Sequence, residues 1–163
     1  PTRRPSDLER IRKAPLPFTT MTLQQEAAKV LNFGTQKTMR IAQQLYEGID
    51  IQGNGTVGVI TYLRTDSTRI SEEADEAARA YIASAYGKEY VAAGAQAKKT
   101  EKKIQDAHEA IRPTDITRTP ASLKDSLSRD QLRLYQLIWQ RFAASRMQPA
   151  KSETISVKKG AGE

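Results

Sequence analysis

Two helical patterns separated by a glycine-containing break constrain the fold of this 163-residue chain more than any other feature. Thr22 and Gln25 are spaced as a capping box, which predicts that the first helix begins at Thr22. Its expected buried face consists of Leu23, Ala27, Val30 and Leu31. Residues 32–34 read Asn-Phe-Gly and are expected to end that helix. Thr35 can cap a second helix, which is expected to end near Gly48.

A β-hairpin pattern follows directly. Residues 49–63 alternate between apolar and polar side chains on both sides of Gly53-Asn54-Gly55, the turn chemistry that joins two antiparallel strands. Helix, turn, basic helix and hairpin in this order resemble a winged helix-turn-helix, in which the second helix and the wing meet nucleic acid. Met39, Ala42, Leu45 and Tyr46 are expected to face inward from the second helix. Lys37 and Arg40 lie on its expected outer face and are candidate DNA contacts. The alternative to a winged helix-turn-helix is a small helical domain in which two helices and a hairpin pack together without a role in binding nucleic acid.

The rest of the chain is mostly helical in pattern. Residues 71–86 are expected to form a helix that begins at Ser71 with acidic residues in its first turn. Ser128 and Gln131 again form a capping-box pattern, at the start of a long helix that Pro149 would stop. Residues 91–103 read as a surface loop and residues 154–157 as a short strand. The predicted fold class is mainly α with small β elements.

Charge and composition narrow the function. Lysine and arginine number 26 against 19 aspartate and glutamate, which gives a formal charge of +7 and a sequence pI near 9.7. Such an excess favours an anionic partner, most commonly nucleic acid. The chain has no cysteine, which excludes thiol catalysis and disulfides. No apolar run is long enough to cross a membrane. The absence of cysteine and of a visible secretory signal fits a cytoplasmic protein, which we expect.

One tyrosine lies in an unusual setting. Tyr62 follows a short apolar run in the stretch ITYLRTDST, and Arg64, two residues on, shares its face if the strand continues. Most tyrosines in such a place only pack against neighbours. A phenol becomes a better nucleophile where a cation stabilises the phenolate or a base takes its proton. Asp66 and the following hydroxyl residues add acceptors and donors, so the stretch also has the composition of a phosphoryl-transfer site.

His108 is the only histidine of the chain. If residues 104–112 form a helix, His108 and Arg112 are four apart and share one face. A lone histidine is more often structural than catalytic, and with no second histidine or cysteine it makes a poor metal site. Beside a phosphate, however, its imidazole and the guanidinium of Arg112 would both stabilise negative charge.

Several stretches together resemble the bacterial type IA DNA topoisomerases. The residues that carry the resemblance are, in chain order, PLPFTT, LQQEAAKVL, KTMRIAQQLYEGI, ITYLRTDST and QDAHEAIRPTD. The resemblance covers residues 15–147, with the motifs in the order of that family. It implies a winged-helix, CAP-like domain that carries the active-site tyrosine.

The resemblance also implies roles for individual residues. Tyr62 matches the nucleophile that attacks a phosphodiester of single-stranded DNA and forms a 5′-phosphotyrosyl bond. Arg64 matches the arginine that positions the phosphate, and His108 matches the histidine that supports it. Asp66 and Arg112 match supporting positions of the same motifs. The implied activity is relaxation of negative supercoils without ATP.

The chain departs from the family pattern in informative places. The acidic Toprim cluster that binds Mg²⁺ in the full enzymes has no counterpart here, so we expect no cofactor in this chain and no activity from it alone. Residues 22–148 are expected to form the tyrosine domain, with residues 1–21 and 149–163 as stubs of the arch domain. Met21 stands where the family has a small polar residue, and Ser152 where a bulkier strand residue is expected.

These expectations define the partners and the main alternative. Single-stranded DNA and the remaining domains of a parent topoisomerase are the implied partners, and the chain by itself could self-associate through surfaces those domains would cover. The alternative is a winged-helix DNA-binding module without catalysis, in which Tyr62 is structural. Loss of DNA binding on substitution of Lys37 or Arg40, with no covalent product, would favour that alternative.

Overall fold

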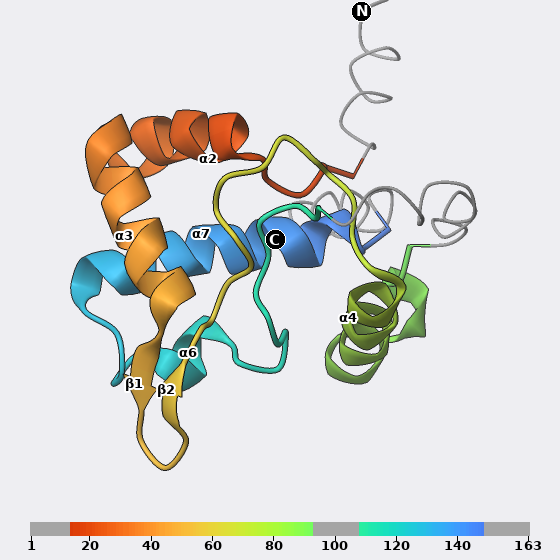
Figure 1. Ribbon diagram of the computed structural model, residues 1–163. Coiled ribbons are helices and arrows are strands. Elements are labelled where there is room, and N and C mark those ends of the chain that lie inside the picture. The colour runs from red at the N-terminus through yellow and green to blue at the C-terminus, as the bar shows by residue number, and fades with distance from the viewer. Residues whose placement is uncertain (1–13, 93–107, 149–163) are drawn as a thin grey trace, which may run out of the picture.

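The computed structural model describes residues 14–92 and 108–148 as a mainly helical molecule with one two-stranded sheet (Figure 1). The elements in chain order are α2 (Thr20–Glu26), the π-helix η1 (Ala27–Leu31), α3 (Thr35–Glu47), β1 (Ile49–Ile51), β2 (Gly55–Val57), α4 (Glu72–Ala85), the 3₁₀-helix η2 (Lys88–Tyr90), α6 (Pro120–Leu123) and α7 (Arg129–Ser145). The predicted strand at 154–157, the predicted stop at Pro149 and most of the predicted loop at 91–103 lie outside the described residues.

The first helix begins earlier than the sequence pattern predicts. Thr19 is the N-cap of α2, and its hydroxyl accepts a hydrogen bond from the Thr22 amide at 3.2 Å. The Thr22 hydroxyl in turn accepts from the Thr19 amide at 2.9 Å, which completes a reciprocal capping box. The predicted start at Thr22 is therefore wrong, because threonine can fill the position usually held by glutamate or glutamine.

The break between the first two helices consists of the short π-helix η1 and a left-handed residue. After η1, Asn32 adopts a left-handed conformation at φ 62°, and Gly34 rather than Thr35 is the N-cap of α3. One turn of a π-helix contains more residues than one turn of an α-helix, so the side chains that follow are shifted around the helix axis. This shift explains why Val30 is exposed, contrary to the prediction.

The predicted hairpin is confirmed and is short. Strands β1 and β2 are antiparallel, with Ile49 opposite Val57 and Ile51 opposite Gly55. Gly53 and Gly55 have φ angles of 85° and 74°, which glycine adopts without strain. The chain leaves the sheet after Val57, and Ile60 forms a bridge with Pro113 instead.

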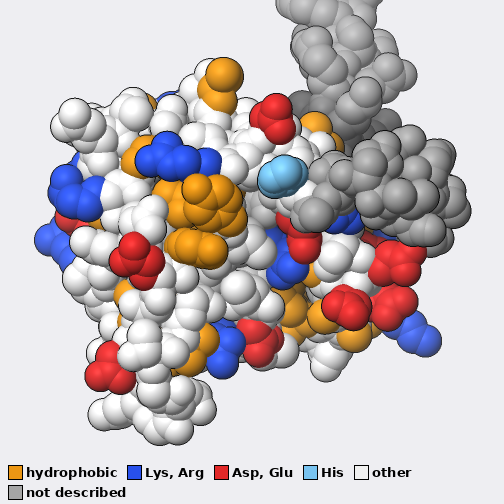
Figure 2. Space-filling view, in the orientation of Figure 1, with side chains coloured by type: hydrophobic (Ala, Val, Ile, Leu, Met, Phe, Trp, Pro, Cys, Tyr) orange, Lys and Arg blue, Asp and Glu red, His pale blue; other side chains and the backbone are white. Residues whose placement is uncertain are grey.

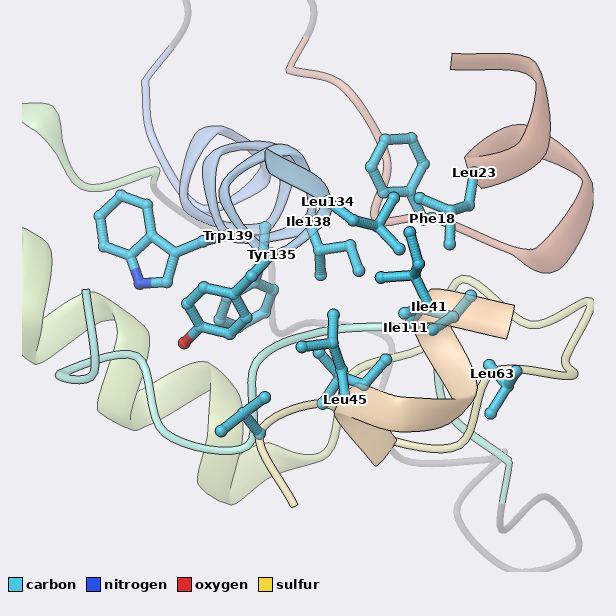
Figure 3. Packing of buried hydrophobic residues seen from close by; sticks show 14 of the residues in the cluster. Phe18, Leu23, Ile41, Leu45, Leu63, Ile111, Leu134, Tyr135, Ile138 and Trp139 are labelled. Atoms are coloured by element: carbon cyan, nitrogen blue, oxygen red, sulfur yellow. The ribbon is translucent and has the colours of Figure 1, made fainter. Parts of the chain in front are cut away.

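Helix α7 runs through the middle of the molecule and organises the core (Figures 1 and 3). Its predicted capping box is confirmed, since Ser128 and Gln131 exchange hydrogen bonds of 3.2 and 2.9 Å. The α7 side chains that contribute to the core are Leu134, Tyr135, Ile138, Trp139, Phe142 and Ala143. Residues from the N-terminal segment, α2, α3 and the loops pack onto them, including Phe18, Leu23, Ile41, Leu45, Leu63 and Ile111 (Figure 3).

Candidate active site

Three segments that are distant in sequence meet beside the hairpin. Their backbones are joined by hydrogen bonds from the Ile111 amide to the Phe18 carbonyl at 2.9 Å, the Thr61 amide to the Arg112 carbonyl at 2.9 Å, the Thr114 amide to the Val59 carbonyl at 3.0 Å, and the Thr20 amide to the Thr65 carbonyl at 2.9 Å. These segments contain PLPFTT, ITYLRTDST and HEAIRPTD, which is the described part of QDAHEAIRPTD. The structure therefore brings together the stretches that carry the candidate residues.

The segment at 108–114 is extended, which corrects the predicted helix for its described residues, while residues 104–107 lie outside the described part of the chain. Ile111 and Pro113 form isolated antiparallel bridges with Phe18 and Ile60. The Ala110 amide donates to the Arg69 carbonyl at 2.9 Å rather than to a carbonyl four residues back. The expectation that His108 and Arg112 share a helical face is therefore wrong. The apolar spacing of this segment is helical, but its backbone amides donate hydrogen bonds to distant segments instead of to carbonyls of the same helix.

Tyr62 is presented at the surface of this framework. Its side chain is 48% exposed, Leu63 is fully buried and Arg64 is exposed again, as expected for an extended segment with one face on the core. The Tyr62 hydroxyl has no hydrogen-bond partner among residues 14–92 and 108–148. Arg64 has no ion-pair partner in the same part of the chain. The phenol and the guanidinium are both available to an anionic ligand.

The ring of Tyr62 does have a partner. The ring of Tyr46, in the last turn of α3, lies 5.2 Å from it between centroids, at an interplanar angle of 66°. Tyr46 had been expected to point inward, but its side chain is 39% exposed. The inward prediction is therefore wrong: at the end of α3 Leu45 fills the core position and Tyr46 faces the neighbouring segment. No sequence pattern indicated this contact.

The turn after Tyr62 is built from hydroxyl side chains. The Ser67 amide donates to the Thr65 hydroxyl, and the Arg69 amide donates to the Ser67 hydroxyl, both at 3.0 Å. The Thr20 hydroxyl donates to the Leu63 carbonyl at 2.6 Å and accepts from the Thr65 amide at 2.8 Å. Asp66 lies exposed within this turn. Hydroxyl groups thus make the hydrogen bonds that hold the backbone of this turn. The Asp66 carboxylate makes none within the described residues.

His108 is tied to this turn through its backbone. Its carbonyl accepts from the Ser67 hydroxyl at 3.3 Å and from the Arg69 Nε at 3.2 Å. The imidazole is exposed, and Figure 2 shows it in pale blue on the same face as an orange hydrophobic patch, blue basic side chains and red acidic side chains. The structure thus places the His108 backbone beside the Tyr62 segment.

Arg112 is engaged within the protein. Its Nε and Nη2 donate to the two carboxylate oxygens of Glu109 at 2.7 and 3.1 Å, and Nη1 donates to the Pro113 carbonyl at 3.0 Å. Only 13% of the Arg112 side chain and 19% of the Glu109 side chain are exposed. Glu109 also accepts from the Ser71 amide at 3.1 Å, which joins the pair to the N-terminus of α4.

Glu109 was missed by sequence reasoning, since no sequence pattern identifies its ion pair with Arg112 in an extended segment. Burial raises the pKa of the Glu109 carboxyl. The hydrogen bond and charge of Arg112, the Ser71 amide and the charge of Arg69 together outweigh burial, and the net pKa lies below its ordinary value. Glu109 therefore carries its negative charge at neutral pH and holds Arg112 in place.

The two candidate DNA contacts on α3 differ in their surroundings. The Lys37 Nζ lies 3.0 Å from the Asp130 carboxylate and 4.5 Å from the centre of the Phe33 ring, so it links α3 to α7. Arg40 is exposed and has no ion pair among the described residues. Of the two cations, Arg40 is the one not engaged within the described part of the protein.

Two further classes of feature are absent from the described residues. No group of three or more histidine, cysteine, aspartate or glutamate side chains in residues 14–92 and 108–148 is arranged to hold a metal ion. No helix in these ranges is both long enough and apolar enough to cross a bilayer.

Comparison with known proteins places the chain in a family. Residues 4–163 match the family described as DNA topoisomerase. The structure is also similar to that of full-length topoisomerase I from Thermotoga maritima, with a TM-score of 0.72 and 48% sequence identity. That match covers 83% of this chain and 21% of the Thermotoga protein, so the chain spans about a fifth of its length. The chain belongs to the bacterial type IA DNA topoisomerase family.

Proposed function

We propose that this chain carries the nucleophile of a type IA topoisomerase, and that Tyr62 is this nucleophile. The supporting observation is an exposed phenol without a hydrogen-bond partner in the described residues, two positions from the unpaired cation Arg64. Both lie on a segment held by hydrogen bonds to the two neighbouring motifs. The substrate is a phosphodiester of single-stranded DNA. Cleavage and religation of the strand change the linking number of the DNA.

The proposed reaction is a reversible transesterification. The Tyr62 oxygen attacks phosphorus, a phosphotyrosyl bond forms to the 5′ side, and the bond from phosphorus to the 3′ oxygen breaks. The phenol loses a proton and the leaving 3′ oxygen gains one. Arg64 donates paired hydrogen bonds to phosphate oxygens, and His108 adds a donor, so both offset the charge that develops there. Religation reverses these steps without ATP, because the ester conserves the energy of the broken bond.

In this proposal, Mg²⁺ would be bound by another part of a longer enzyme. The described residues lack a carboxylate cluster arranged to hold Mg²⁺, so they do not fit a site for it, and no step above depends on a metal. A Toprim-containing partner would supply the bound metal and assist proton transfer. We place this role in the cytoplasm, at chromosomal DNA, with relaxation of negative supercoils as the activity.

The arrangement of residues 20–57 supports a winged-helix assignment as part of the proposal. Helix α3 takes the place of the second helix and the β1–β2 hairpin that of the wing. The stretch from Ile49 to Val57 contains no lysine or arginine, and Lys37 is paired with Asp130. This module therefore serves to support the Tyr62 segment more than to grip the DNA backbone, with Arg40 as its candidate phosphate contact.

The test is covalent capture of DNA. The chain is mixed with the Toprim-containing part of a type IA topoisomerase, Mg²⁺ and an end-labelled single-stranded oligonucleotide, and adducts are counted after denaturation. We expect an adduct with the wild-type chain, none with Tyr62→Phe, and none with the chain alone. Tyr86→Phe is the matched control, because Tyr86 is 47% exposed, against 48% for Tyr62, but lies at the end of α4.

Two outcomes would contradict the proposal. An adduct that persists in Tyr62→Phe would assign the nucleophile to another residue. Oligonucleotide binding without an adduct under complementation would instead favour a non-catalytic winged-helix module. Sedimentation over a range of concentrations shows separately whether the chain self-associates.

A further inference from the structure

The contact between Tyr46 and Tyr62 lies outside the core. Both side chains remain exposed, at 39% and 48%, and the rings meet edge to face at 5.2 Å. Among residues 14–92 and 108–148 this is the only ring-to-ring contact of Tyr62. Edge-to-face geometry is favourable for aromatic pairs, because the positive edge of one ring meets the negative face of the other.

The backbone holds the two tyrosines in register. The Val59 amide donates to the Leu45 carbonyl at 3.0 Å, which ties the end of α3 to the segment that leads into Tyr62. At Gly58 the approach is closer still, since a Cβ there would lie 2.6 Å from the Tyr46 carbonyl oxygen. Only glycine permits this approach without a shift of the backbone. The position of Tyr46 relative to Tyr62 is thus set by the main chain.

The orientation of the Tyr62 ring depends on few other contacts. Its hydroxyl has no partner within the described residues, and nearly half of the side chain is in solvent. An exposed tyrosine with no restraint samples several staggered rotamers. A nucleophile spread over several rotamers spends only part of its time aimed at phosphorus.

We infer that Tyr46 is a positioning residue for Tyr62, whose ring it restrains through the edge-to-face contact at the end of α3. This inference rests on the proposed role of Tyr62 as nucleophile. The Tyr46 hydroxyl has no hydrogen-bond partner in the described residues, so the ring is the part that acts. Tyr46→Phe therefore keeps the function, and Tyr46→Leu loses it.

The first test measures the ring itself and needs no activity. The chain is labelled with 3-fluorotyrosine, and the ¹⁹F signal of Tyr62 is assigned by its loss in Tyr62→Phe. We expect Tyr46→Leu to shift this signal, because the neighbouring ring current is removed, whereas Tyr46→Phe leaves it close to its wild-type position. Tyr86→Leu is the matched control, since it removes an exposed tyrosine from another edge-to-face pair, with Tyr81 at 6.3 Å. An unchanged Tyr62 signal in Tyr46→Leu would overturn the inference.

The second test separates positioning from DNA binding. Adduct formation is followed in single turnovers with the Toprim-containing partner, at saturating oligonucleotide, and oligonucleotide affinity is measured separately. Loss of an aromatic pair is expected to slow adduct formation about three- to tenfold in Tyr46→Leu. Affinity is expected to stay unchanged, and Tyr46→Phe to react at nearly the wild-type rate.

Each other outcome has a definite meaning. A normal single-turnover rate in Tyr46→Leu would overturn the inference. Weaker affinity with a normal rate at saturation would also overturn it, and would make Tyr46 a base-stacking residue. Failure of Tyr62→Phe to abolish the adduct would refute the proposed function instead, while the ¹⁹F result would still report on the ring contact. Circular dichroism melting of each variant shows that a slow variant is folded.

Discussion

Two tyrosines in this molecule have opposite surroundings. Tyr135 on α7 is fully buried, and its hydroxyl donates to the Arg118 carbonyl at 2.5 Å. Burial raises the pKa of Tyr135, and the nearby Asp115 carboxylate adds to this, while the Arg118 charge opposes it. Tyr62 is half exposed, and its hydroxyl has no partner among the described residues. The Tyr135 hydroxyl is committed to the fold, whereas that of Tyr62 is available to a ligand.

The same contrast holds for the basic residues. Arg112 and Lys37 are paired with Glu109 and Asp130, whereas Arg64 has no ion pair within residues 14–92 and 108–148. Glu109 is mostly buried, so removal of Arg112 would leave a buried carboxylate unpaired, whereas the Lys37–Asp130 pair is exposed and contributes little to stability. A side chain left without a partner on a rigid framework contributes little to stability and is free to act on a substrate. Substitutions should therefore separate the two groups.

The largest expected difference is in the free energy of unfolding. Tyr135→Ala removes a fully buried ring and leaves the Arg118 carbonyl without its donor, so we expect a loss of about 3–5 kcal/mol. Tyr62→Ala removes a half-exposed ring with one aromatic contact and should cost about 1 kcal/mol or less. Urea unfolding of both variants measures the two values. Equal losses would show that Tyr62 belongs to the core and would end the comparison.

A smaller effect is expected at Glu109. Glu109→Gln removes the charge that holds Arg112, and we expect a loss of about 1–2 kcal/mol in the free energy of unfolding at neutral pH. Asp66→Asn is the matched control, since Asp66 is exposed and has no ion pair among the described residues, and it should change stability by less than about 0.5 kcal/mol.

The contribution of Glu109 to the free energy of unfolding should depend on pH. The folded-state pKa of Glu109 lies below its ordinary value of 4.5, so the folded protein binds fewer protons than the unfolded chain near that pH. The contribution of Glu109 is therefore present above pH 4.5 and is lost as the pH falls through the lower folded-state pKa. Wild type and Glu109→Gln should converge in stability on acidification. A constant difference across that range would contradict the assignment.

The smallest effect concerns DNA affinity. Arg40→Ala should weaken binding of a single-stranded oligonucleotide about two- to threefold. The slope of the logarithm of the binding constant against the logarithm of the salt concentration should become less steep by about 0.7, the value for one phosphate contact. Lys37→Ala should weaken binding less, because Lys37 is already paired with Asp130. Fluorescence anisotropy over a range of salt concentrations measures both. A larger effect of Lys37→Ala would show that the Asp130 pair opens to bind DNA.

Local patterns predicted well where the structure is decided locally. The hairpin around Gly53-Asn54-Gly55, the N-cap at Ser71 and the capping box of α7 at Ser128 were all readable from short-range chemistry. Alternation around Leu63 also indicated that Tyr62 and Arg64 would lie on the same side. Turns, caps and alternating strands depend on neighbours within a few residues, and the sequence shows those directly.

The errors arose where distant segments compete with local preference. Residues 108–112 have helical spacing, yet their backbone amides bond to Phe18, Thr61 and Arg69 and keep the segment extended. The Glu109–Arg112 pair and the Tyr46–Tyr62 contact depend on this same packing or on the end of α3. None of these could be assigned before the segments were placed in space.

The amino-acid sequence by itself determined the mainly helical class, the hairpin, the basic charge, the family and the identity of the candidate nucleophile, because composition, motifs and short-range turn chemistry carry that information. Only the tertiary structure decided which side chains are free to act. Whether Arg64 is unpaired and Arg112 engaged, or Tyr62 restrained by Tyr46, depends on which segments the core brings together, and burial and pairing across long separations leave no periodic trace in the chain.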